Sequence, residues 1–218
     1  MRALFCAALF LTACPALIAQ AHPAAAAHSY TSELGFSYDL PSDWEVVSQQ
    51  GDVSQAKEQA AKDASSEQEK KGLACAQMGM RAQHAGSVIV NVALPFDCFG
   101  QQLSESDLPS FGDGASQGLK RSFDIGEPSY GSYALGSHNV WIERVKGTPK
   151  GQAATPYTIE IACAILKKAA VCWMAIAADD VGLQAFEHAR LALDGEAAAA
   201  LVPANAFKPA ETAKPEGK

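Results

Sequence analysis

The pentapeptide Gly114–Gly118 (GASQG) fits the pattern Gly-x-Ser-x-Gly, which is the nucleophile elbow of serine hydrolases. Ser116 would be the nucleophile, His138 and His188 follow it in the chain, and Asp179 could be the third member of a triad. The elbow also needs a buried apolar strand directly before it, and residues 107–113 (DLPSFGD) do not form one. The sequence therefore favours an amphipathic helix weakened by its glycines, and an exported serine hydrolase using Ser116 is the alternative.

The histidines suggest a second kind of chemistry. Cleavage of a leader after Ala21 or Ala27 would leave His22 or His28 as the new N-terminus, where an amine and an imidazole together can chelate copper. The start of the chain is rich in Ala and Pro, which makes it a poorly organised ligand. The 24 acidic residues include no distinctive catalytic pair. We therefore expect no catalytic residue, no metal site and no cofactor, and hence a non-enzymatic protein.

Four cysteines follow the leader, and an even number in an exported chain predicts disulfides. Residues 157–166 and 169–177 alternate in hydrophobicity around Lys167-Lys168, which predicts a hairpin with a two-residue turn. In that register Cys163 faces Cys172 at a non-hydrogen-bonded position, where the Cα atoms of paired strands come closest. The same register places the larger apolar side chains on one side: Tyr157, Ile159, Ile161, Ile165, Met174 and Ile176.

Cys75 and Cys98 are then left to pair with each other. They bracket a second predicted hairpin, made of residues 73–83 and 87–94 around a turn at residues 84–86. The chain contains no Cys-x-x-Cys motif, and the spacing of the four cysteines forms no zinc knuckle. The sequence therefore predicts structural disulfides Cys75–Cys98 and Cys163–Cys172.

Residues 1–21 are typical of a secretory leader: Arg2 is followed by a short apolar run, and residues 19–21 (AQA) suit signal peptidase. Cutting after residue 27 is also possible, and residues 11–14 (LTAC) resemble a lipobox, which would make the protein a structural lipoprotein acylated at Cys14. Removal of the leader leaves 16 basic and 24 acidic residues, a net charge of −8. This charge disfavours nucleic-acid binding. No later apolar stretch is long enough to span a membrane.

The chain after the leader divides into three parts. Residues 22–29 form a flexible lead-in, residues 30–194 one domain, and residues 195–218 an Ala/Pro/Lys-rich tail predicted to be disordered. Within the domain we expect three helices, at residues 53–71, 105–122 and 180–193. The expected strands cover residues 35–40, 44–47, 73–83, 87–94, 129–135, 138–146, 157–166 and 169–177. Short turns between consecutive strands predict a mostly antiparallel sheet flanked by helices, an α+β fold.

Residues 34–47 (LGFSYDLPSDWEVV) resemble the opening of PsbP-like domains, a superfamily that includes the extrinsic P subunit of photosystem II and bacterial envelope proteins of the DcrB type. In those domains a strand ending in Leu-Pro is followed by a turn, a Trp and a second strand. The order of elements over residues 30–194 is similar to theirs. The resemblance implies an α/β/α sandwich and a non-enzymatic accessory or binding role.

The sequence thus predicts an exported, periplasmic or secreted binding or accessory protein of the cell envelope. The expected partner is another envelope protein or a small apolar molecule, bound on a sheet face or edge. Trp141 and Trp173 are candidates to line that surface, because both fall on predicted strands.

Overall fold

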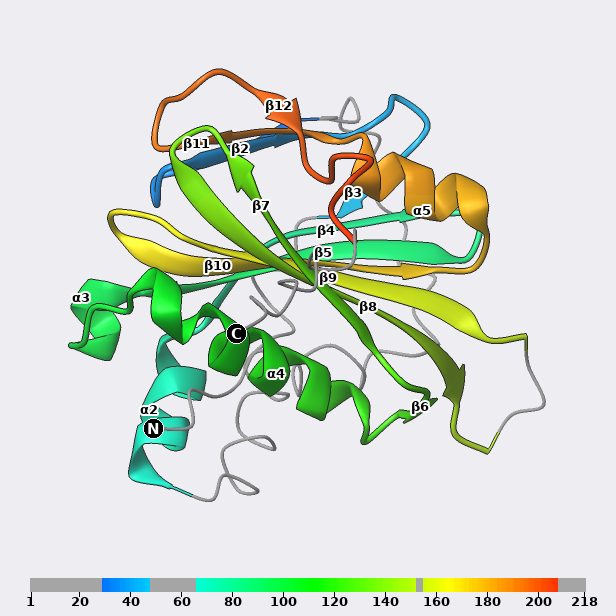
Figure 1. Cartoon of the computed structure of the whole chain (residues 1–218), viewed down its shortest axis with the longest axis horizontal. Helices are drawn as coiled ribbons and strands as arrows, with labels where there is room; N and C mark the ends of the chain where they lie inside the picture. The colour runs from blue at the N-terminus through cyan, green and yellow to red at the C-terminus, as the bar shows by residue number, and fades with distance from the viewer. Residues whose placement is uncertain (1–28, 48–65, 152–154, 208–218) are drawn as a thin grey trace, which may run out of the picture.

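The computed structural model describes residues 29–47, 66–151 and 155–207, and these residues form two antiparallel sheets (Figure 1). The larger sheet has the strand order β3-β4-β5-β10-β9-β8-β6, and β7 also pairs with β8. The smaller sheet has the order β1-β2-β11-β12. The strands of the larger sheet are β3 (Glu45–Val47), β4 (Gln77–His84), β5 (Ser87–Pro95), β6 (Phe123–Ile125), β7 (Ser129–Leu135), β8 (His138–Pro149), β9 (Tyr157–Ile165) and β10 (Ala169–Ala177). Those of the smaller sheet are β1 (Ser29–Ser32), β2 (Phe36–Asp39), β11 (Arg190–Leu193) and β12 (Ala199–Ala200).

The helices are short, and only one face of the larger sheet is covered mainly by helices. One face of the larger sheet packs against α2 (Glu67–Cys75), α3 (Phe96–Phe99) and α4 (Leu108–Leu119), and the opposite face packs against the smaller sheet and α5 (Asp180–Glu187). The prediction of a helix-flanked α/β/α sandwich is therefore wrong. The described part of the chain consists mainly of antiparallel sheet, with a second sheet where a helical layer was expected.

The error arises at the end of the predicted last helix. Asp179 caps α5 by accepting a hydrogen bond from the Gly182 N–H at 2.8 Å, but the helix ends at Glu187. Residues 190–193 instead form β11, which pairs with β2. Leu191 and Leu193 are buried and alternate with less buried neighbours, which is the period of a strand. The spacing of apolar residues over 186–193 fits a helix as well as a strand, so only the distant partner β2 decides between them.

The predicted hairpins are confirmed. Strands β9 and β10 pair with Cys163 opposite Cys172, and the Leu166 N–H donates to the Ala169 carbonyl at 2.8 Å across the turn. The Cys163–Cys172 disulfide joins Cα atoms 4.1 Å apart, and Cys75–Cys98 joins Cα atoms 5.6 Å apart. Cys75 ends α2 rather than lying on a strand, and Cys98 lies in α3, so the second disulfide ties two helices together. Both predicted disulfides are confirmed.

The chain beyond Asp194 continues to pack against the domain as far as Phe207. Leu201 and Val202 are buried, and their N–H groups donate to the carbonyls of Ala189 and Glu187 at 2.8 and 2.9 Å. The Tyr133 hydroxyl donates to the Leu201 carbonyl. The predicted disordered tail at 195–218 therefore starts too early, and its residues 208–218 lie outside the described residues.

Several predictions fall on parts of the chain that the structure does not describe. They are the leader at 1–21, the alternative cut after residue 27, the possible acylation at Cys14, most of the lead-in and most of the helix predicted at 53–71. Within the described ranges, no helix has both the length and the apolar character needed to cross a membrane.

Candidate functional site

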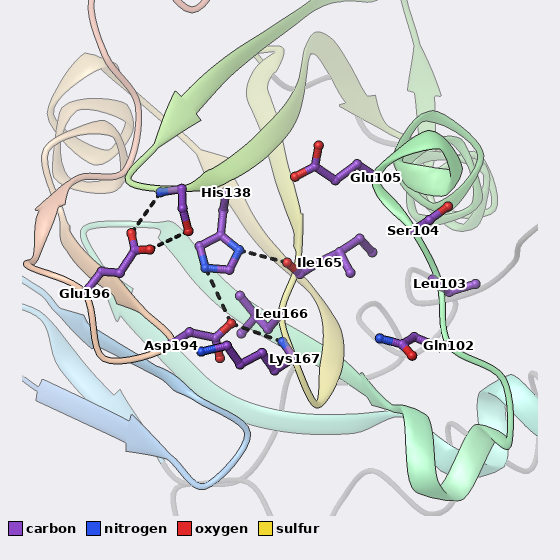
Figure 2. Close-up of a pocket in the computed structure, with 11 residues that line it drawn as sticks. Gln102, Leu103, Ser104, Glu105, His138, Ile165, Leu166, Lys167, Asp194 and Glu196 are labelled. Carbon is purple, nitrogen blue, oxygen red and sulfur yellow. Dashed lines mark hydrogen bonds and ion pairs between the residues drawn. The ribbon is translucent and has the colours of Figure 1, made fainter.

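A cleft of about 580 Å³ opens at one end of the two sheets, where several turns come together (Figure 2). The turn before β8 and the turn between β9 and β10 form two sides, the end of β11 forms a third, and the segment before α4 forms the fourth. The residues lining the cleft are Gln102, Leu103, Ser104, Glu105, Ser137, His138, Ile165, Leu166, Lys167, Asp194 and Glu196.

The His138 side chain is held between two oxygen atoms. Its Nδ1 lies 3.0 Å from the Ile165 carbonyl oxygen, and its Nε2 lies 3.4 Å from the Asp194 Oδ2 atom (Figure 2). The same Oδ2 atom accepts a hydrogen bond from the Lys167 N–H at 3.1 Å. Asp194 thus connects the end of the smaller sheet to a turn of the larger one, and it fixes the orientation of the imidazole.

Glu196 is fixed by the turn that precedes β8. Its Oε2 accepts the Ser137 N–H at 3.0 Å, and its Oε1 accepts the Ser137 hydroxyl at 2.5 Å. These hydrogen bonds lower the pKa of Glu196, because they stabilise the ionised carboxylate. A Cβ atom at Gly136, whose φ is +60°, would lie 1.6 Å from Glu196 Oε2. Glycine at this position therefore permits both the turn and the close approach of the carboxylate.

The opposite wall of the cleft is the segment before α4. Ser104 and Asp107 form a capping box there: the Ser104 N–H donates to Asp107 Oδ2 at 2.9 Å, and the Ser104 hydroxyl donates to the same atom at 2.8 Å. These bonds lower the pKa of Asp107. Glu105 reaches across the cleft and accepts the Asn139 N–H at 3.2 Å. Leu103 and Leu166 are buried and form the apolar part of the lining.

The polar groups of the cleft are already engaged with one another. The Ser137 hydroxyl donates to Glu196, and both ring nitrogens of His138 face oxygen acceptors. These contacts hold both side chains in fixed orientations. No cluster of three or more His, Cys, Asp or Glu residues that could hold a metal occurs within the described ranges. The lining of the cleft thus combines three carboxylates with the Lys167 ammonium.

Ser116 lies away from this cleft, in the middle of α4 rather than on a turn between a strand and a helix. Its hydroxyl donates to Glu143 Oε1 at 2.9 Å, so its partner is a carboxylate and not a histidine. His138 is held by Asp194, and His188 caps the C-terminal end of α5. The structure therefore brings together none of the residues of the serine-hydrolase hypothesis.

Neither candidate tryptophan lines the cleft. Trp173 is completely buried between the sheets, where the Phe36 ring meets it edge-on at 5.6 Å. Trp141 is buried beneath α4, in contact with Gly112, and its ring lies 5.8 Å from that of Tyr130. Both tryptophans pack in the cores on either side of the large sheet.

The residues that do form the cleft come from turns that are far apart in the sequence. Gly136-Ser137-His138 and Asp194-Gly195-Glu196 carry only the ordinary signals of turns, and nothing in either segment indicates the other. Pairing of β11 with β2 and of β7 with β8 brings them together. This cleft lies at the end of the sheets, whereas the surface predicted from the sequence is a sheet face or edge.

In comparisons with known proteins, no family model and no curated protein matches this chain. The resemblance of residues 34–47 to PsbP-like domains stays a prediction.

Proposed function

We propose that this protein is an exported, non-enzymatic binding or accessory protein of the cell envelope, and that the cleft around His138 and Glu196 holds its partner. Two disulfides, together with the absence of a membrane-crossing helix from the described residues, are consistent with an exported soluble protein. The leader-like residues 1–21 support export to the periplasm or the medium.

The observation that carries the proposal is that the polar groups of the cleft are hydrogen-bonded or paired with one another. Ser137, His138, Asp194 and Glu196 hold one another in place, so the cleft is organised before any partner arrives. A surface that is already rigid loses little conformational entropy when a partner binds.

The composition of the cleft favours a polypeptide segment over a small apolar molecule as its occupant. Glu105, Asp194 and Glu196 supply carboxylates, and Leu103 and Leu166 supply a limited apolar patch. An apolar ligand would cover the carboxylate oxygens that still face water without giving them a new hydrogen-bond donor, which is costly. A segment with one basic and one apolar side chain would match both features. The expected partner is therefore another envelope protein.

The test is photo-crosslinking in the cell that makes the protein. A photoreactive amino acid replaces the exposed Gln102 at the mouth of the cleft, and the matched control carries it at the exposed Gln77 on β4. We expect position 102 to capture a reproducible envelope protein that position 77 does not. Equal capture at both positions, or none at position 102, would contradict the proposal.

The non-enzymatic part of the proposal has its own test. The purified mature protein is incubated with a fluorophosphonate probe, with Ser116→Ala as the control. We expect no labelling in either protein, because the Ser116 hydroxyl, in the middle of α4, donates its hydrogen bond to Glu143 of β8. Stoichiometric labelling that disappears in Ser116→Ala would establish the hydrolase alternative instead.

A further inference from the structure

A second, smaller cleft of about 190 Å³ lies between α4 and the chain that runs from β6 into β7. One stripe of α4 forms its first wall, with Asp113, Ser116, Gln117 and Lys120 at helical spacing. Residues 125–130 form the second wall, and β8 lies beneath both. Figure 1 shows α4 running beside β8 toward β6.

Glu143 lies at the bottom of this cleft. It shares its side of β8 with Trp141 and Val145, which belong to the apolar core beneath α4. The Glu143 side chain is 1% exposed, and burial raises the pKa of its carboxyl group. Its Oε1 accepts the Ser116 hydroxyl, but its buried Oε2 has no partner among the described residues.

An unpartnered buried oxygen is costly, and among the residues with such an atom Glu143 is the one that also lines a described cleft. The unpaired acceptor costs about 1–3 kcal/mol. An alanine in place of Ser116 and an apolar residue in place of Glu143 would fill the same space without that penalty. The carboxylate is therefore better explained by a ligand that donates a hydrogen bond to Oε2.

The rest of the cleft indicates the charge of that ligand. The exposed Asp113 adds a second carboxylate, and both it and Glu143 lie close enough to raise the pKa of Tyr130, in addition to the larger effect of burial. The Tyr130 side chain is 53% exposed, so one ring face is available to a ligand. Acceptor oxygens together with an aromatic face suit a cation that carries N–H donors.

We propose that this cleft binds an alkylammonium or guanidinium group, which donates hydrogen bonds to Glu143 Oε2 and Asp113 and lies against the Tyr130 ring. The cleft has room for a group the size of one side chain. Lys120, which also lines it, competes with the ligand through its own positive charge. The inference concerns a different cleft from that of the proposed function, and neither depends on the other.

The experiment is a titration of the full mature protein with small cations at low salt. NMR and calorimetry detect the binding. The probes are n-butylammonium and N-acetyl-lysine methylamide, and their neutral counterparts are 1-butanol and N-acetyl-norleucine methylamide. We expect saturable binding of both cations and of neither neutral compound, with shifts at Gly126 and Tyr130. A lysine derivative that binds much more tightly than butylammonium identifies a protein side chain as the source, and equal affinities identify a free amine.

Three variants test the assignment of residues. Glu143→Gln keeps an acceptor for Ser116 but turns an amide N–H₂ toward the ligand, so we expect a loss of affinity of about tenfold or more. Asp113→Asn should weaken binding less, because Asp113 is exposed, and Lys120→Met should strengthen it. Asp124→Asn, on the exposed side of β6, is the matched control and should leave affinity unchanged.

The two surface variants keep the test valid if Glu143→Gln fails to fold, since neither Asp113 nor Lys120 is buried. Binding of 1-butanol equal to that of butylammonium would overturn the proposal. So would unchanged affinity in both Asp113→Asn and Lys120→Met, or the absence of saturable binding by either cation.

Discussion

The two faces of the large sheet are stabilised in different ways. The core between this sheet and α4 contains aliphatic residues together with Phe111, Phe123 and Trp141, and a disulfide within one hairpin reinforces it. The core between this sheet and the small sheet includes aromatic residues from distant parts of the chain: Trp173 from the large sheet, Phe36 from the small sheet and Phe186 from α5. Among the described residues, the second core alone includes the N-terminal strands of the small sheet, so it depends on contacts between segments more than a hundred residues apart, such as that of Phe36 with Trp173.

Buried polar groups are also distributed unequally. Six buried side-chain polar atoms lack a partner within the described residues, and only Glu143 Oε2 lies on the α4 face. The other five, from Tyr38, Asn91, Glu160 and Trp173, lie on the face toward the small sheet. The core toward the small sheet therefore also holds most of the unpartnered buried polar atoms. Mutations there should have the larger effects on the free energy of unfolding.

Arg144→Met should have the largest effect. Arg144 Nε donates to the fully buried Glu160 at 2.6 Å, and its guanidinium also pairs with Glu187 of α5 and lies 4.2 Å from the Phe207 ring centroid. Removal of the cation leaves Glu160 buried without a partner, which should lower the free energy of unfolding by about 4 kcal/mol at neutral to alkaline pH. Lys146→Met, at an exposed position on the same strand, is the control. Urea denaturation measures both, and equal losses would contradict the comparison.

Glu160 also predicts how the stability depends on pH. Burial raises the pKa of Glu160 from 4.5 to about 7, although the adjacent Arg144 guanidinium acts in the opposite direction. The folded state then holds this proton more tightly than the unfolded state, so the contribution of Glu160 to stability is greatest below pH 4.5 and falls as pH rises to about 7. The change should be on the order of 3 kcal/mol. Denaturation of Glu160→Gln should show a flatter profile over that range, and an unchanged slope would refute the assignment.

Loss of the Cys163–Cys172 disulfide tests the stability of the other face, the one toward α4. Cys163→Ala together with Cys172→Ala should cost about 3 kcal/mol through the added freedom of the unfolded chain. The folded hairpin should persist, because its register is also fixed by the apolar side chains beneath α4. Cys75→Ala with Cys98→Ala, which opens a longer loop, should cost slightly more. Non-reducing peptide mapping checks the pairs, and a Cys75–Cys163 crosslink would disprove them.

Close packing of α4 on the sheet predicts a smaller effect. A Cβ atom at Gly112 would lie 1.9 Å from the Trp141 ring, so Gly112→Ala must displace the helix and should cost about 2 kcal/mol. At Gly126 the nearest atom to a Cβ is 3.5 Å away, and Gly126→Ala should be close to neutral. Thermal denaturation with tryptophan fluorescence distinguishes the two variants. A neutral Gly112→Ala would show that α4 lies further from the sheet.

The smallest predicted effect tests the attachment of the C-terminal segment. Tyr133→Phe removes the hydroxyl that donates to the Leu201 carbonyl, and it should cost about 1 kcal/mol. It should also expose residues 195–207 to protease more readily. Tyr130→Phe, at an exposed ring, is the matched control. Equal rates of cleavage in both variants would favour the disordered tail that the sequence suggested.

The same contrast explains what could be predicted from the sequence. Alternating residues on either side of Lys167-Lys168 specified the cysteine hairpin and its register, because all the relevant contacts lie within the hairpin. Leu191 and Leu193 fit a helix or a strand equally well, and their pairing with β2 is decided by residues far away in the chain. The candidate cleft could not be predicted for the same reason, since His138 and Asp194 meet only after both sheets have formed.

The most direct test of the proposed function is occlusion of the cleft around His138. Gln102→Trp places a large ring at its mouth without disturbing a buried residue, and Gln77→Trp places the same ring at an exposed position on β4. Each purified mature variant is used to capture partners from the envelope that contains the protein. The account predicts that Gln102→Trp loses the partner recovered by the unmodified protein, while Gln77→Trp retains it. Equal recovery by all three proteins would contradict it.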